Sequence, residues 1–365
     1  MDADARYKDV FMRSPVPSPA PEPEEAATNM AKITLGLWST HGPILNTTPE
    51  EWMLRVPHDH KIRHWFRNRE YSFEELVELR KDENFAAQIT LEERTRRHAL
   101  CQQGVAKLAQ VWKQEKPDVC VIMGNDQREL IQDSMQPMFT IYHGTDFWQA
   151  PMDHERSGKL PVGIKESEWA YRPPEPVVWP GLPDLAELIF EMGADAGFDF
   201  AASKSWPDTG HHHHIGTPHA FSWIIRRVME DAAVPILPII TNTFFPPNQP
   251  TSKRCFEMGE FIGKAIKAWK RDVKVAVIGS GGLTHFTIDE NFDNALMKSL
   301  ETRDKKFLCS VPQTTLMQGT SEIRNWIAAA GALFNTDLKG EVVGYVPCYR
   351  TIAGTGTAQG FAYWK

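Results

Sequence analysis

Short apolar runs alternate with segments of helical periodicity along most of the chain. The apolar runs lie at 119–123, 234–242 and 273–280, and the helical patterns lie at 182–197, 217–232, 256–270 and 321–334. Apolar runs of this length are typical of strands that are buried on both faces of a sheet. Their alternation with helices predicts an α/β fold in which helices flank a central sheet.

Two helix boundaries are marked by residue type. Gly197 predicts the end of the helix over 182–197, because glycine is favoured just past a helix C-terminus. Thr217 suits an N-cap and Pro218 suits the first helical position, so the next helix is predicted to start there.

Residues 1–29 and 50–115 do not follow the alternation. The first segment is rich in Pro, Ala and Glu and cannot bury enough apolar surface to offset its ordering entropy, so we expect a flexible tail. One domain is expected over residues 30–365. Residues 50–115 carry helical patterns and are predicted to form a helical insert or lid within it.

Charge and composition narrow the classes of function. The chain of 365 residues has a formal net charge of −7. This acidic balance lacks the overall positive charge that is typical of proteins that bind nucleic acid or an anionic membrane. No apolar run approaches the roughly 20 residues of a membrane helix. The N-terminus lacks the basic segment followed by an apolar segment that is typical of a secretion signal. The five cysteines show no paired short spacing, which disfavours disulfides and a thiolate zinc site. We therefore expect a cytoplasmic protein that binds neither nucleic acid nor membrane.

Polar turns with potential ligands follow three of the predicted strands. These turns are Ser39–Gly42, Gly124–Gln127 and Gly279–His285. In α/β sheets, the loops at the carboxyl ends of strands gather side chains around a ligand. A single loop histidine is more often a surface residue, so His41 and His285 gain weight only together. The third turn lacks the lysine and the spacing of nucleotide-binding loops, which argues against a nucleotide site.

A run of four histidines, His211–His214, precedes the helix predicted over 217–232. In an extended segment neighbouring side chains point to opposite faces, so only every second histidine can face one pocket. A solvated loop is the alternative. His219, inside the helix, is expected to serve packing.

Taken together, these motifs resemble the class III extradiol dioxygenases, the family of the protocatechuate 4,5-dioxygenase beta subunit and the gallate and 3-O-methylgallate dioxygenases. The resemblance extends from about residue 32 to 364, and 50–115 matches least. Its carriers are LGLWSTHGP, PDVCVIMGNDQRE, the histidine run before TPHAFSW, NTFFPPNQPTSKRCFEMG, VIGSGGLTH, GTSEIRNW and YRTIAGTGTAQGFAYW. It implies a catalytic domain with a mixed central sheet flanked by helices and a helical insert.

The resemblance also implies roles for individual residues. The family holds a non-haem Fe(II) with two histidines and a glutamate. His41 matches the first histidine ligand and Glu322 the glutamate, whereas His285 matches the catalytic acid/base. His213 matches a further catalytic histidine, by its distance to the proline that follows, and His212 is its nearest competitor and is assigned to substrate binding.

Gln127 departs from the family pattern, because it stands where the second histidine ligand is common. An amide oxygen is a weaker donor than imidazole, so Gln127 would complete the metal site with looser binding. Glu129 or a loop histidine are the alternatives for the third ligand. For Glu322 the alternative is structural, since the helix dipole stabilises a carboxylate in the first turn of a helix.

The implied activity is extradiol cleavage of a catechol-type ring, gallate- or protocatechuate-like, with O2. Substrate and O2 would bind neighbouring positions on the iron, and His285 would accept a phenolic proton. Arg350 is a prospective partner for a substrate carboxylate, although a surface position is more common for such a residue. A homodimer is expected. The rivals are a divalent-metal hydrolase or lyase on the same scaffold, which needs no O2, and a binding or assembly protein without catalysis.

Overall fold

The computed structural model describes residues 29–152, 158–206 and 216–365. The predicted tail, except for its last residue, lies outside these ranges. The histidine run, which includes His212 and His213, lies outside them as well.

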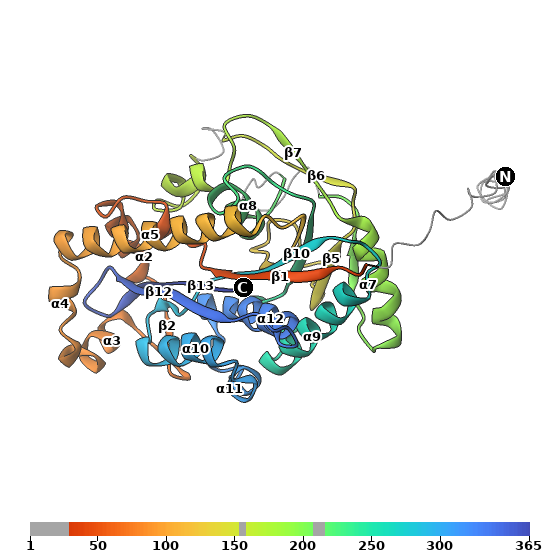
Figure 1. Cartoon of the computed structure of the whole chain (residues 1–365). Helices are drawn as coiled ribbons and strands as arrows, with labels where there is room; N and C mark the ends of the chain where they lie inside the picture. Colours follow the sequence, from red (N-terminus) through yellow and green to blue (C-terminus); the bar gives the residue numbers. More distant parts are fainter. Residues whose placement is uncertain (1–28, 153–157, 207–215) are drawn as a thin grey trace, which may run out of the picture.

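Nine strands of the described residues form one mixed sheet (Figure 1). They are β1 Lys32–Ser39, β4 Val119–Asn125, β5 Phe139–Tyr142, β8 Ala201–Ser203, β9 Ile236–Thr241, β10 Lys274–Ser280, β11 His285–Thr287, β12 Gly340–Tyr349 and β13 Thr355–Trp364. Their order is β11–β13–β1–β10–β4–β9–β5–β8, and β12 pairs with β13. Two small antiparallel sheets of two strands each lie outside the large sheet. They are β2 His64–Phe66 with β3 Arg69–Tyr71, and β6 Asp146–Gln149 with β7 Val177–Pro180.

The helices of the described residues are of two kinds. The α-helices are α2 Val56–Asp59, α3 Phe73–Leu79, α4 Phe85–Gln88, α5 Leu91–Glu115, α7 Pro183–Asp195, α8 His219–Arg227, α9 Ser252–Ala268, α10 Glu290–Thr302, α11 Lys305–Ser310 and α12 Ile323–Leu333. The 3-10 helices are η1 Pro43–Leu45, η2 Glu51–Arg55, η3 Lys81–Glu83, η4 Lys165–Ala170 and η6 Gln318–Glu322. None of them combines the length and the apolar character that crossing a bilayer requires.

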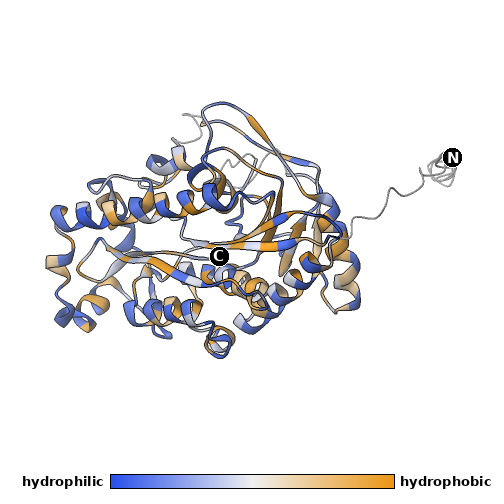
Figure 2. Ribbon diagram, in the orientation of Figure 1, coloured by the Kyte–Doolittle hydropathy of each residue, from blue (hydrophilic) through white to orange (hydrophobic). Residues whose placement is uncertain are grey.

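Helices cover both faces of the central strands, as predicted for an α/β fold. Strands β1, β10, β4 and β9 run parallel, and successive side chains of a strand point to opposite faces. Along β4, Val121 and Met123 belong to the core under α9 and α12, whereas Cys120 and Ile122 belong to the core under α5 and α8. Figure 1 shows these helix pairs on opposite sides of the sheet, and Figure 2 shows the hydrophobic strands between them. The continuous apolar runs therefore reflect strands that are buried on both faces.

Residues 50–115 are less helical than the sequence predicts. The stretch expected to be helical up to Phe66 contains β2, which pairs with β3. The side chain of Gln318 fixes this stretch, because it accepts a hydrogen bond from the backbone N–H of Trp65 at 3.1 Å and donates to the carbonyl of Arg63 at 2.8 Å. A contact distant in sequence thus overrides local periodicity.

One of the two helix boundaries is correct. Helix α7 ends at Asp195, and Gly197 follows with a φ of +75°. Helix α8 begins at His219 with Pro218 as its N-cap, so the predicted cap at Thr217 is wrong. The Thr217 hydroxyl donates instead to the carbonyl of Trp148 at 2.9 Å, which ties the start of α8 to β6.

Candidate active site

The three polar turns lie together at one edge of the sheet. Strands β1, β10 and β4 are parallel neighbours, so their carboxyl ends meet at the same edge. This edge is where an α/β sheet offers a site. His41 follows β1, Ser280 ends β10, and Asn125 ends β4.

His41 is held in one orientation by Ser280. Its Nδ1 lies 2.9 Å from the Ser280 hydroxyl oxygen, and that hydroxyl donates its single proton to the carbonyl of Ala220 at 2.6 Å. The Ser280 oxygen must therefore accept from His41, which places the imidazole proton on Nδ1. The Nε2 lone pair is left free, and Nε2 is buried without a hydrogen-bond partner. Burial also lowers the pKa of His41, which favours the neutral imidazole that a metal needs.

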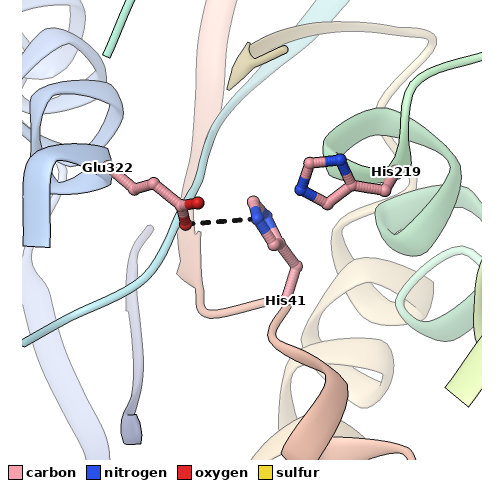
Figure 3. Close-up of side chains that lie close together, drawn as sticks. All are labelled: His41, His219 and Glu322. Atoms are coloured by element: carbon pink, nitrogen blue, oxygen red, sulfur yellow. Dashed lines mark ion pairs between the residues drawn. The ribbon is translucent and has the colours of Figure 1, made fainter. Parts of the chain in front are cut away.

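Glu322 faces the free nitrogen of His41 from the junction of η6 and α12. Its Oε2 lies 3.3 Å from His41 Nε2 (Figure 3). Its Oε1 accepts hydrogen bonds from Asn125 Nδ2 and Gln127 Nε2, each at 3.3 Å. Burial raises the pKa of Glu322. In acid, where His41 is protonated, the charge of His41, its hydrogen bond to Glu322 and the charge of His219 outweigh burial and lower this pKa to about 2. The carboxylate is therefore ionised at neutral pH.

His219 is the third member of the cluster, and the expectation that it serves only packing is wrong. It opens α8, and its ring lies edge-on to the ring of His41 with 4.7 Å between centroids. Its Nδ1 lies 2.7 Å from Glu129 Oε2, and its backbone N–H donates to Glu129 Oε1 at 2.9 Å. Burial lowers the pKa of His219, but the Glu129 charge prevails and raises this pKa to about 9. Because Glu129 engages Nδ1, Nε2 is the nitrogen that can take a metal.

The three side chains fit a metal ion. Potential ligand atoms of His41, His219 and Glu322 all lie within 4.8 Å of one another. Three donors at about 2.1 Å from one ion are at most about 4.2 Å apart, so small side-chain movements close the site. The buried, unpartnered Nε2 of His41 is the orphaned polar atom that an ion would satisfy. Two histidines and one carboxylate on one side of an ion are the donor set of non-haem Fe(II) oxygenases.

His285 lies beside this cluster between two glycines. Its Nδ1 is 2.7 Å from the carbonyl of Leu283, so Nδ1 carries the proton and Nε2 can accept one. A Cβ atom on Gly282 would lie 2.2 Å from the His285 ring, and one on Gly319 would lie 1.9 Å from it. These two positions therefore require glycine for the ring to occupy its place.

One cavity of about 280 Å³ joins these groups. His41, His219, Glu322, His285 and Gln127 line it, as do the apolar residues Ile44, Trp52, Ile164, Phe244 and Phe286. Arg350 lines it too and is only 4% exposed, so the expectation of a surface position is wrong. The Nε and Nη2 atoms of Arg350 donate to the two carboxylate oxygens of Asp59, at 2.6 and 2.7 Å.

The fold thus gathers His41, Gln127, His285 and Glu322, all of which the sequence singled out. His219 was missed, together with the role of Glu129 as its partner. Pro218 was the sequence feature that could have indicated His219. It marks the start of a helix and places residue 219 in the first helical turn, where the chain enters the site.

Comparison with known proteins identifies the family of the chain. The model of the family described as "Catalytic LigB subunit of aromatic ring-opening dioxygenase" matches residues 88–360. Gallate dioxygenase of Pseudomonas putida is 33% identical over 64 residues, which are 18% of this chain and 16% of that protein. The stretch shared with this relative is therefore a small part of either chain. Because the family model covers well over half of the sequence, the chain belongs to the LigB family of catalytic subunits of aromatic ring-opening dioxygenases.

Proposed function

We propose that this protein is a non-haem Fe(II)-dependent extradiol dioxygenase that cleaves a catechol-type ring, gallate- or protocatechuate-like, with O2. The observation that carries the proposal is the cluster of His41, His219 and Glu322 on the wall of a largely apolar cavity that also contains His285. Family membership supports the reaction class.

In this proposal His41 Nε2, His219 Nε2 and a Glu322 oxygen hold the iron. When bound, Fe(II) supplies adjacent coordination positions at which the two oxygens of a catechol and O2 meet. Gln127 is the competing third ligand. Its amide already lies against Glu322, and His219 is favoured because Glu129 fixes its ring as carboxylates commonly do for histidine ligands.

Residues of the chain would then accept a substrate proton and exclude water from the cavity. His285 holds its Nδ1 proton on the Leu283 carbonyl, so its Nε2 is the acceptor for a phenolic proton of the substrate. Trp52, Phe244 and Phe286 offer apolar walls for an aromatic ring. Both atoms of O2 enter the ring-opened acid, so no further reductant is required.

The cellular compartment and the oligomeric state are part of the same proposal. All five cysteines are free thiols, which suits a reducing compartment and supports a cytoplasmic enzyme. The homodimer remains a prediction from the sequence.

Oxygen uptake tests this function. Protein loaded with Fe(II) under anaerobic conditions should, once O2 is admitted, consume one O2 for each 3,4-dihydroxybenzoate or 3,4,5-trihydroxybenzoate opened. The new absorbance should come from a semialdehyde acid with the first compound and from a tricarboxylic keto acid with the second. Conversion of these compounds without O2, or with zinc in place of iron, would support the hydrolase or lyase instead.

A further inference from the structure

Two arginines line the cavity, and they differ in how they are neutralised. Arg350 is bound through two of its nitrogens to Asp59, and the Thr355 hydroxyl also donates to Asp59 at 2.7 Å. A substrate carboxylate that used the same two nitrogens would displace Asp59, which is fully buried. Leaving a buried carboxylate unpaired is costly, so Arg350 is poorly suited to bind substrate.

Arg55 is the other arginine of the cavity wall, and it comes from η2. Within the described residues its guanidinium takes part in no hydrogen bond or ion pair. Burial lowers the pKa of Arg55, the nearby charge of Arg350 lowers this pKa further, and the charge of Asp59 partly offsets both effects. The unpaired cation therefore lies in a partly desolvated position beside an Arg350–Asp59 pair whose charges largely cancel, where an anion is favoured.

Glu51, Glu168 and Glu322 are the acidic residues of the cavity wall, and none of them forms an ion pair with Arg55 in the described part of the chain; Glu322 faces His41 instead. Glu51 accepts a hydrogen bond from the backbone N–H of Thr48 at 2.8 Å. Glu168 pairs with Arg172 at 2.8 Å. The charge of Arg55 is therefore available to a ligand in the cavity.

The stem of Arg55 is held in place by close packing. A Cβ atom on Gly163 would lie 2.6 Å from Arg55 Cδ, so the chain at Gly163 lies directly against the stem. Gly163 has a φ of +84°, a backbone conformation that favours glycine. An arginine with a fixed stem loses less side-chain entropy when it binds an anion.

We propose that Arg55 binds the carboxylate of the substrate, and that Arg55 thereby selects aromatic carboxylates over catechols without this group. The inference rests on the proposed function, because the same cavity must take the ring. Arg350 supports the subsite as a paired cation. Arg55 lies outside residues 88–360, so the specificity would come from a segment beyond the region that the family model matches.

Binding experiments under anaerobic conditions test this inference without turnover. Isothermal titration calorimetry of the iron-loaded protein compares the affinities for 3,4-dihydroxybenzoate and catechol. It is carried out on the wild type and on the variants Arg55→Met, Arg55→Lys and Arg69→Met. Arg69 is an exposed arginine of the same segment and serves as the matched control. Loss of a charge-assisted hydrogen bond should weaken 3,4-dihydroxybenzoate about 10- to 100-fold in Arg55→Met. Catechol should change less than about twofold, Arg55→Lys should recover part of the loss, and Arg69→Met should resemble the wild type.

The outcomes separate the inference from the proposed function. If Arg55→Met weakens the binding of both ligands equally, or of neither, Arg55 does not bind the carboxylate. The proposed function would still stand in that case, provided that the wild type binds catechol. If the iron-loaded wild type binds neither ligand, the proposed function fails at the same step.

Discussion

Removal of the Ser280 hydroxyl is the perturbation that isolates how the fold prepares His41. Ser280 is fully buried, and its oxygen connects His41 Nδ1 to the carbonyl of Ala220. In Ser280→Ala, the Nδ1 proton of His41 loses its acceptor in a place that water does not reach.

Two responses are available to His41 in this variant, and both reduce metal affinity. The Nδ1 proton can stay unpaired, which costs about 1 to 3 kcal/mol for a buried donor. Alternatively, the proton moves to Nε2, the nitrogen that faces Glu322 and must carry the metal. Changes to such outer partners of metal ligands typically lower metal affinity about 10- to 100-fold, and we expect a loss in this range.

Competition with a coloured chelator, under anaerobic conditions and with Fe(II) or Co(II), measures this affinity. Ser299→Ala is the matched control, because Ser299 is also buried and its hydroxyl donates to the carbonyl of Leu296 at 2.7 Å, in α10. The control should lose some stability but keep the metal affinity of the wild type. If Ser280→Ala binds metal as tightly as Ser299→Ala, the assignment of the His41 tautomer is refuted.

Three further predictions concern the same cluster. Glu129→Gln should weaken metal binding about 10-fold in the chelator assay, because His219 loses a charged partner on Nδ1; an unchanged affinity would count against His219 as a ligand. His285→Ala should keep its metal by elemental analysis but lose O2 uptake, whereas His41→Ala should lose both, and the reverse pattern would exchange their roles. The pKa of Glu322 in the metal-free protein is lowered from 4.5 to about 2, so the ionised carboxylate stabilises the fold above pH 4.5 and this stability is lost as the pH falls toward about 2. Urea unfolding of metal-free Glu322→Gln should therefore depend less on pH over this interval, and an equal dependence would contradict the stated pKa.

The order of elements could be predicted because burial on both faces leaves a strong mark on a strand. The apolar runs at 119–123 and 273–280 became β4 and β10, at the centre of the sheet. The hairpin of β2 and β3 could not be predicted, since the side chain of Gln318, more than 200 residues away, holds its backbone. The division into a tail over 1–29 and one domain over 30–365 remains a prediction.

The site was predictable to the extent that its residues follow strands. His41 and Gln127 lie in turns after β1 and β4, and His285 opens β11 directly after the turn that follows β10. The parallel order of β1, β10 and β4 brings these turns together. His219 could not be inferred in this way, because it follows no strand. It is the first residue of α8, and its backbone N–H is held at the site by a hydrogen bond to Glu129. The pairing of Arg350 with Asp59 was equally hidden, since it joins residues 291 positions apart.

Diffraction from crystals grown with Fe(II), with anomalous data collected at the iron absorption edge, tests the proposed metal centre most directly. We predict one iron peak about 2.0 to 2.3 Å from His41 Nε2, His219 Nε2 and a Glu322 oxygen. A peak bound by Gln127 in place of His219 would contradict the ligand set, and a peak away from His41 and Glu322 would contradict the metal centre itself.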